Sequence, residues 1–140
     1  MKNIKTKIIN LNREGHGESN PTLLRIILHP DYTKIDFGYS AIEIFQSGGW
    51  IRIDPFTFIE IIELNQRLTL VRAVGIPLSP IHLSFESNKD WQYYSLYFPP
   101  IPQKNCTLNI IEIEKGTLND FNYYNIAINM TDALEILDFD

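Results

Sequence analysis

The sequence has almost no cysteine and lacks any long apolar run, and each absence restricts the kind of protein it encodes. Cys106 is the only cysteine among 140 residues, so neither an intramolecular disulfide nor a cysteine-based metal cluster can form. Asn10 interrupts the aliphatic residues from Ile8 to Leu11, so no apolar run of signal-peptide length stands near the start. Nothing approaches the run of about 18 apolar residues that a membrane-spanning helix needs. We therefore expect a cytoplasmic protein in a reducing compartment, with no membrane contact.

Basic residues are fewer than acidic residues. The chain has 12 Lys and Arg against 17 Asp and Glu, a formal net charge of −5 and a pI near 5.1. Proteins that bind nucleic acid usually present a basic face that neutralises phosphates. The charge balance therefore favours partners other than nucleic acid.

Motifs of catalysis are missing. The chain contains no G-x-S-x-G nucleophile elbow and no P-loop, and Asn20 replaces the third glycine of a dinucleotide-type loop that starts at Gly15. The three histidines have no second His or Cys at metal-ligand spacing; they are His16, His29 and His82. We expect no cofactor, no metal site and no enzymatic activity. A hydrolase would need His16 or His82 beside a serine and a carboxylate.

Pairs of acidic or acid–base residues have plainer interpretations than catalysis. His16 and Glu18 stand in a Gly-rich loop, where a solvated loop is the favoured interpretation over an acid–base pair. Glu112 and Glu114 share one face of an expected strand, which favours a polar outer face over a catalytic carboxylate pair. Cys106 is expected to be a small apolar filler.

Short apolar and aromatic runs dominate what is present. Apolar residues make up 44% of the chain and aromatic residues 12%, a composition that favours strands in a globular fold. Strands are expected at 5–11, 22–28, 34–45, 50–53, 67–74, 81–85, 91–98, 107–114 and 121–129. Turn residues separate them and almost no helix is expected. The sequence thus predicts one all-β domain over 1–140, an immunoglobulin-like antiparallel β-sandwich of about eight strands.

Two segments fit this pattern less clearly. Residues 56–64 suit a short helix or a strand about equally, and the β surroundings favour extended structure. The acidic tail, 131–140, is expected to form a short helical turn, because Asp132 followed by Glu135 approximates a capping box.

The aromatic strand at 91–98 is the feature around which the other strands are organised. In a strand, side chains alternate between faces, so Tyr94, Leu96 and Phe98 share one face. Its other face carries Trp91, Tyr93, Ser95 and Tyr97 and is therefore aromatic too. These outer aromatics either pack under a loop or the C-terminal tail, or form a contact surface for a partner.

A second aromatic position lies at the start of the 50–53 strand. Ile51 and Ile53 are expected to face inward, which leaves Trp50 and Arg52 together on the outer side. That spacing suits a cation–π contact at the surface.

Four segments occur in the order found in a family of bacterial β-sandwich modules of unknown function. They read GWIRIDPFTFI, VRAVGIPLSP, YSLYFPPIPQKNCTLNIIEIE and NYYNIAI, between Trp50 and Ile128. The chain resembles this family most closely in the block from Phe98 to Pro102, and departs from it around Asn109, where NIIE replaces the expected DFIE. The resemblance implies an immunoglobulin-like fold and a scaffold or recognition role, and it supplies no catalytic residues.

The leading hypothesis is a non-enzymatic protein-interaction or scaffold module, in which Trp91, Tyr93, Tyr97, Trp50 and Arg52 contact a protein partner. It would act as a small subunit of a larger assembly or as a homo-oligomer formed by strand addition. The alternative is a small-molecule or carbohydrate binder that stacks its ligand in an aromatic cleft. A hydrolase is the least favoured of the three.

Overall fold

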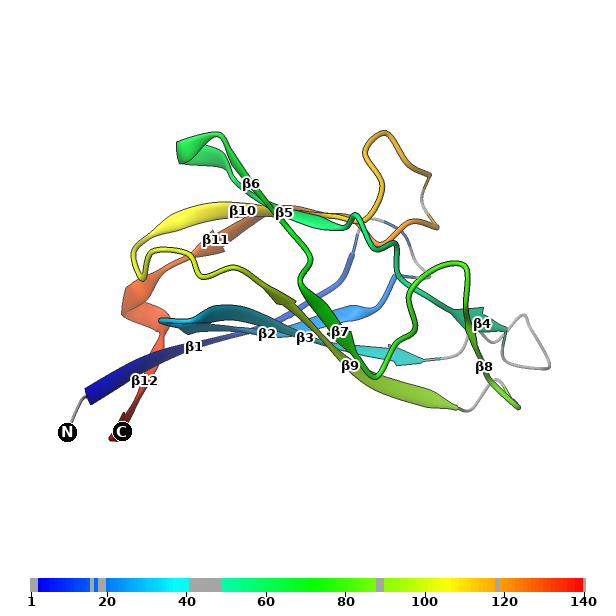
Figure 1. Cartoon of the computed structure of the whole chain (residues 1–140), viewed down its shortest axis with the longest axis horizontal. Helices are drawn as coiled ribbons and strands as arrows, with labels where there is room; N and C mark the ends of the chain where they lie inside the picture. Colours follow the sequence, from blue (N-terminus) through cyan, green and yellow to red (C-terminus); the bar gives the residue numbers. More distant parts are fainter. Residues whose placement is uncertain are drawn as a thin grey trace.

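Antiparallel sheets build the protein, as the computed structural model shows (Figure 1). The structure describes residues 3–15, 17, 20–40, 49–87, 90–117 and 119–139. Within these ranges the strands form a six-stranded, a four-stranded and a two-stranded sheet. The predicted all-β sandwich is thereby confirmed, and the immunoglobulin-like strand order is consistent with this arrangement.

The six-stranded sheet contains the N-terminal strands, the aromatic strand and the end of the chain. In spatial order its strands are β12 (Leu134–Phe139), β1 (Asn3–Arg13), β2 (Thr22–His29), β3 (Tyr32–Ser40), β9 (Trp91–Phe98) and β7 (Arg72–Val74).

The four-stranded sheet lies across from it in Figure 1. Its order is β11 (Tyr123–Ile128), β10 (Cys106–Ile111), β5 (Phe58–Ile61) and β6 (Gln66–Thr69). The short strands β4 (Trp50–Ile51) and β8 (Leu83–Ser84) pair with each other beside one end of the sandwich.

The inward faces of the two larger sheets supply the core. Phe37 and Leu96 from the six-stranded sheet and Ile59 and Leu108 from the four-stranded sheet are at most 1% exposed. Each such side chain contributes roughly 1.5–3 kcal/mol through the removal of apolar area from water. The segment after Phe98, with its prolines, carries the chain from one sheet to the other and buries Ile101 on the way.

The ambiguous segment 56–64 contains both kinds of structure. Strand β5 occupies its middle, as favoured, and a 3₁₀ turn, η1 (Ile62–Leu64), follows it. The turn ends at Asn65, which adopts a left-handed conformation with φ of 48° and returns the chain into β6.

The predicted single strand at 67–74 is wrong, because the chain changes sheets within it. Leu70 N donates to Thr57 O in the four-stranded layer, whereas Val71 N donates to Tyr97 O of β9. The segment therefore contributes β6 to one sheet and β7 to the other. Its apolar alternation shifts by one residue where Leu70 and Val71 stand side by side, which is the trace of the crossover in the sequence.

The expected helical tail is also wrong over most of its length. A 3₁₀ turn, η2 (Met130–Asp132), does form, but its cap is Asn129, whose side chain accepts from Thr131 N. Leu134–Phe139 is strand β12, which pairs antiparallel with β1. Pairing with an available sheet edge outweighed the local capping pattern.

Gly75 is the glycine on which the approach of β7 to β9 depends. Its φ is +85°, and an added Cβ would lie 2.7 Å from the backbone oxygen of Tyr93. We predict that Gly75→Ala lowers the free energy of unfolding by about 2 kcal/mol or more, since both strain and a backbone clash oppose it. Chemical denaturation measures this.

Gly38, on β3, is the matched control. A Cβ there would lie 3.6 Å from Leu24 and Tyr93 side-chain atoms, an ordinary contact distance. Gly38→Ala should therefore change the unfolding free energy by no more than about 0.5 kcal/mol. Equal destabilisation by both substitutions would contradict the specific role of Gly75.

Candidate functional site

The outer face of the six-stranded sheet is the candidate site, and β9 is its most aromatic strand. Along β9 the side chains alternate as the sequence predicts, with Tyr94, Leu96 and Phe98 buried. On the opposite face Trp91 and Tyr93 are 61% and 62% exposed. Most of both rings is therefore open to solvent in this chain.

The C-terminal tail does not cover these rings. It forms β12 at one edge of the six-stranded sheet, and β1, β2 and β3 separate it from β9. The interpretation in which the tail buries the outer aromatics is therefore wrong. The exposed side chains of Leu134, Ile136 and Leu137 belong to that distant edge.

Trp91 and Tyr93 contact each other. Their ring centroids lie 4.8 Å apart with the planes at 80°, an edge-to-face arrangement that aromatic pairs favour. Register explains the exposure of Tyr93, because its cross-strand partner is Gly38, which has no side chain to cover it. The pair forms a continuous aromatic surface at the start of β9.

Tyr97 has a different environment from the other two outer aromatics. It is half-buried, with the Arg72 guanidinium 4.5 Å from its ring centroid and Lys34 Nζ at 6.0 Å. Tyr32 meets it edge-on, with ring centroids 5.5 Å apart. Tyr97 therefore holds two cations and a second aromatic ring in place, and it is less available to a partner than Trp91 or Tyr93.

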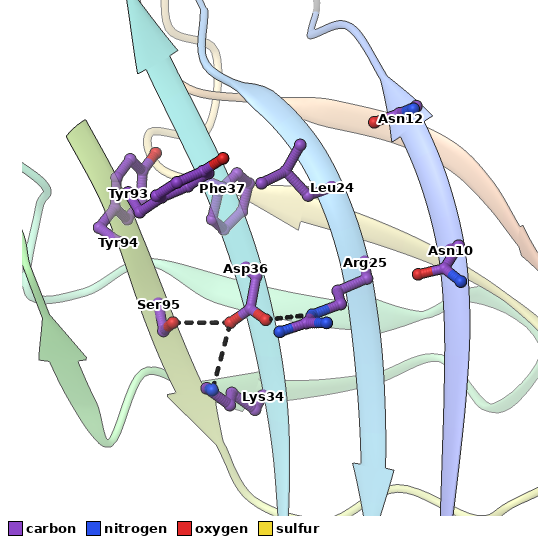
Figure 2. A pocket seen from close by; sticks show the side chains of 10 residues that line it. All are labelled: Asn10, Asn12, Leu24, Arg25, Lys34, Asp36, Phe37, Tyr93, Tyr94 and Ser95. Atoms are coloured by element: carbon purple, nitrogen blue, oxygen red, sulfur yellow. Dashed lines mark hydrogen bonds and ion pairs between the residues drawn. The ribbon is translucent and has the colours of Figure 1, made fainter. Parts of the chain in front are cut away.

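A hollow of about 490 Å³ adjoins Tyr93 on this face. Figure 2 shows its lining, which comes from β1, β2, β3 and β9. Asp36 lies near the centre, the amides of Asn10 and Asn12 stand on the β1 side, and Tyr93 lies at one end. Polar and apolar groups line the hollow in about equal measure, and Tyr93 is the exposed aromatic ring in its wall.

Asp36 organises the charged groups of the hollow (Figure 2). Its carboxylate accepts from Arg25 Nε at 2.6 Å and from Ser95 Oγ at 2.6 Å, and Lys34 Nζ lies 3.5 Å away. The residue is 7% exposed. Burial alone would raise the pKa of Asp36, but the hydrogen bonds from Ser95 and Arg25 and the charge of Lys34 outweigh it and lower that pKa.

Asp36→Asn tests this network. A group whose folded pKa lies below its unfolded value stabilises the fold above the unfolded pKa, near 3.9 for Asp, and loses this contribution as pH falls through the folded pKa. We predict that Asp36→Asn lowers the unfolding free energy by about 1–2 kcal/mol at pH 7. The difference from wild type should shrink below about pH 4.

Asp31→Asn provides the control, because the Asp31 side chain is 84% exposed at the β2–β3 turn. Denaturation curves of the three proteins between about pH 2.5 and 7 measure the effect, since this range brackets the ordinary pKa of an aspartate side chain, about 3.9. If the difference in unfolding free energy between wild type and Asp36→Asn stays constant across that range, the lowered pKa of Asp36 is contradicted.

Trp50 and Arg52 form the predicted cation–π pair but lie in a different part of the molecule. The Arg52 guanidinium is 4.8 Å from the Trp50 ring centroid, and Ile51 and Ile53 are buried as expected. Trp50 belongs to the β4–β8 sheet, and its other ring contact is His82 at 5.0 Å. The structure therefore does not join this pair to the β9 aromatics in one contact cluster.

Glu112 does not lie on a polar outer face, which corrects the sequence-based expectation. Strand β10 ends at Ile111, and the Glu112 carboxylate accepts from the backbone N–H groups of Asp54 and Phe121. Burial raises the pKa of Glu112 despite those two hydrogen bonds. Glu114 does face solvent, where it pairs with Arg67. Glu112 therefore joins two loops to the end of β10.

Several other sequence-based hypotheses concern chemistry. His16 and Glu18 lie outside the described residues, and His82 contacts the Trp50 ring. Burial raises the pKa of the Cys106 thiol. Within the described ranges, no cluster of three or more His, Cys, Asp or Glu side chains is placed to hold a metal ion, and no helix is long and apolar enough to cross a membrane.

Four charged residues of this face were not predicted from the sequence: Arg25, Lys34, Asp36 and Arg72. The first three were visible as polar positions on the outward side of an alternating strand. Arg72 gave no such signal, because its position beside Tyr97 depends on the sheet change after Leu70.

Comparisons with known proteins identify no relative. No family model matches the chain, and no curated protein or solved structure shows significant similarity to it. The resemblance between Trp50 and Ile128 to a bacterial β-sandwich family therefore stays a prediction.

Proposed function

We propose that the protein is a non-enzymatic interaction module that binds a protein partner through the outer face of β9. The observation that carries this proposal is the exposed edge-to-face pair of Trp91 and Tyr93. Trp and Tyr are enriched among the residues that dominate binding energy, because each buries a large area at a small cost in conformational entropy. A folded chain gains nothing from exposing two such rings side by side.

The surroundings of the pair support a contact with a macromolecule. Tyr97 and Arg72 extend the surface along β9, and the hollow around Asp36 adjoins it. Trp91 to Tyr97 spans six residue steps, which is roughly 20 Å of strand at about 3.3 Å per residue. That length suits a short segment of a partner chain. We propose that the protein works in the cytoplasm as a small subunit of a larger assembly.

A small polar ligand or carbohydrate is the second candidate, and the hollow favours it. Asn10, Asn12 and Arg25 offer hydrogen-bond donors there, and Tyr93 offers a ring against which a sugar could stack. However, Trp91 lies outside the lining of that hollow. A ligand confined to the hollow would therefore leave half of the aromatic pair unused, so the protein partner is preferred.

The test is capture of a partner by a double variant, Trp91→Ala with Tyr93→Ala. Both side chains are mostly exposed, so the melting temperature should stay within about 2 °C of wild type while capture from native-cell extract is lost. Mass spectrometry of the captured proteins and thermal unfolding measure the two effects. Tyr97 is left intact because its substitution would disturb Arg72, Lys34 and Tyr32.

A matched control removes two exposed apolar side chains elsewhere, Phe56 and Ile81, which are 78% and 69% exposed. Phe56→Ala with Ile81→Ala should capture the same proteins as wild type. The proposal fails if the Trp91/Tyr93 variant captures them as well, or if only the control variant loses them.

A further inference from the structure

Cations are concentrated on the outer face of the six-stranded sheet, although the whole chain carries a net charge of −5. Arg25, Lys34 and Arg72 lie on β2, β3 and β7, and Asp36 is the acidic residue between them. The central part of this face is therefore positive on an otherwise acidic protein.

These cations are only partly neutralised within the described part of the chain. Arg25 donates to Asp36 through Nε, which leaves its two terminal nitrogens outside that ion pair, and its side chain is 48% exposed. Arg72 is exposed and stacks on Tyr97, and no carboxylate of a described residue lies within ion-pair distance of it. Asp31 lines a second hollow with Arg72 but forms no ion pair with it, and its Oδ2 lies 4.0 Å from His29 Nδ1.

Register places two of the cations on either side of Tyr97, at the other end of β9 from Trp91 and Tyr93. Lys34 faces Tyr97 across β3 and β9, and Tyr97 faces Arg72 across β9 and β7. Neighbouring strands are about 4.8 Å apart, so Lys34 and Arg72 lie roughly 10 Å from each other across the sheet. The outer side of β9 thus begins with two exposed rings and ends between two cations.

We infer that the segment bound by this face is an acidic stretch of a protein partner. Its carboxylates pair with Arg72, Lys34 and the terminal nitrogens of Arg25, and an apolar side chain farther along the same segment packs on Trp91 and Tyr93. This inference rests on the proposed function and names the chemistry of the partner. Complementary charge would also raise the association rate, since the rest of the molecule repels an acidic chain and the cationic face attracts it.

A single-stranded nucleic acid is the other polyanion that uses aromatic rings and cations together. Bases stack successively on exposed ring faces. The Trp91 and Tyr93 planes stand at 80°, so they do not present two parallel faces to neighbouring bases, and the net charge of −5 opposes a long phosphate chain. Both observations favour a short acidic peptide.

The experiment selects peptides on the immobilised protein from a displayed random library of about seven-residue sequences, matched to the roughly 20 Å length of the face at about 3.3 Å per residue. We expect the enriched peptides to carry Asp or Glu together with an aromatic or aliphatic residue, and their affinity to fall as salt rises. Lys34→Gln with Arg72→Gln should weaken a selected synthetic peptide by about tenfold or more. Arg72→Glu alone should also weaken the peptide and leaves the contacts of Asp36 intact. Arg72 is exposed and has no ion-pair partner among the described residues.

The matched control neutralises two exposed lysines of the loops near the other sheet, Lys104 and Lys115. Lys104→Gln with Lys115→Gln changes the net charge equally and should leave the affinity within about twofold, because exposed charges beyond a Debye length are screened. A loss of affinity equal to that of the face variant would overturn the inference in favour of a general charge effect.

Other outcomes separate this inference from the proposed function. Peptides without acidic residues that still require Trp91 and Tyr93 would overturn the acidic partner and leave the interaction module standing. If the selected peptides bind the Trp91/Tyr93 variant and the Lys34/Arg72 variant as tightly as wild type, or if no peptide is enriched, both this inference and the proposed function are overturned. Tight binding of a fluorescein-labelled single-stranded oligonucleotide would identify nucleic acid, in place of an acidic peptide, as the partner. Self-association in sedimentation that is lost in the Lys34/Arg72 variant would identify a second copy of this chain as the partner.

Discussion

The antiparallel pairing of β3 with β9 is the constraint on which the rest of the structure depends. It runs in unbroken register from Thr33 opposite Phe98 to Ser40 opposite Trp91. A shift of one residue would place Tyr94, Leu96 and Phe98 in solvent and the outer aromatics in the core. One register therefore fixes both the packed interior and the exposed surface.

The same register explains why the outer face is charged and open. It sets Asp36 opposite Ser95 and Gly38 opposite Tyr93. In the first pair, Ser95 donates a hydrogen bond to the largely buried carboxylate of Asp36, and Arg25 and Lys34 contact the same carboxylate. The second pair leaves no side chain to cover the Tyr93 ring. The charge and the openness of this face therefore follow from two cross-strand pairs.

Sequence reasoning succeeded where one strand's own pattern carried the information. The alternation from Trp91 to Phe98 predicted which side chains face the core, and the Trp50–Arg52 spacing predicted their contact. It failed where the choice of partner strand decides the outcome. The crossover after Leu70 and the strand at Leu134–Phe139 both depend on sheet edges formed by distant residues.

The candidate site could be predicted only in part from the sequence, because the choice of partner strand is not encoded locally. Trp91 and Tyr93 were identifiable because large aromatics on both faces of one strand are unusual. Arg72 was not, since its place beside Tyr97 arises from a long-range pairing that local periodicity does not encode. Glu112 was misassigned because β10 ends one residue before it, and strand ends are poorly marked in sequence.

Hydroxyl-radical footprinting of the purified protein, alone and with its captured partner, tests the central claim most directly. Trp91 and Tyr93 should be oxidised readily in the free protein and protected in the complex. Trp50, which is 50% exposed in the β4–β8 sheet, should react equally in both samples. Unreactive Trp91 and Tyr93 in the free protein, or protection of Trp50 in their place, would contradict the account.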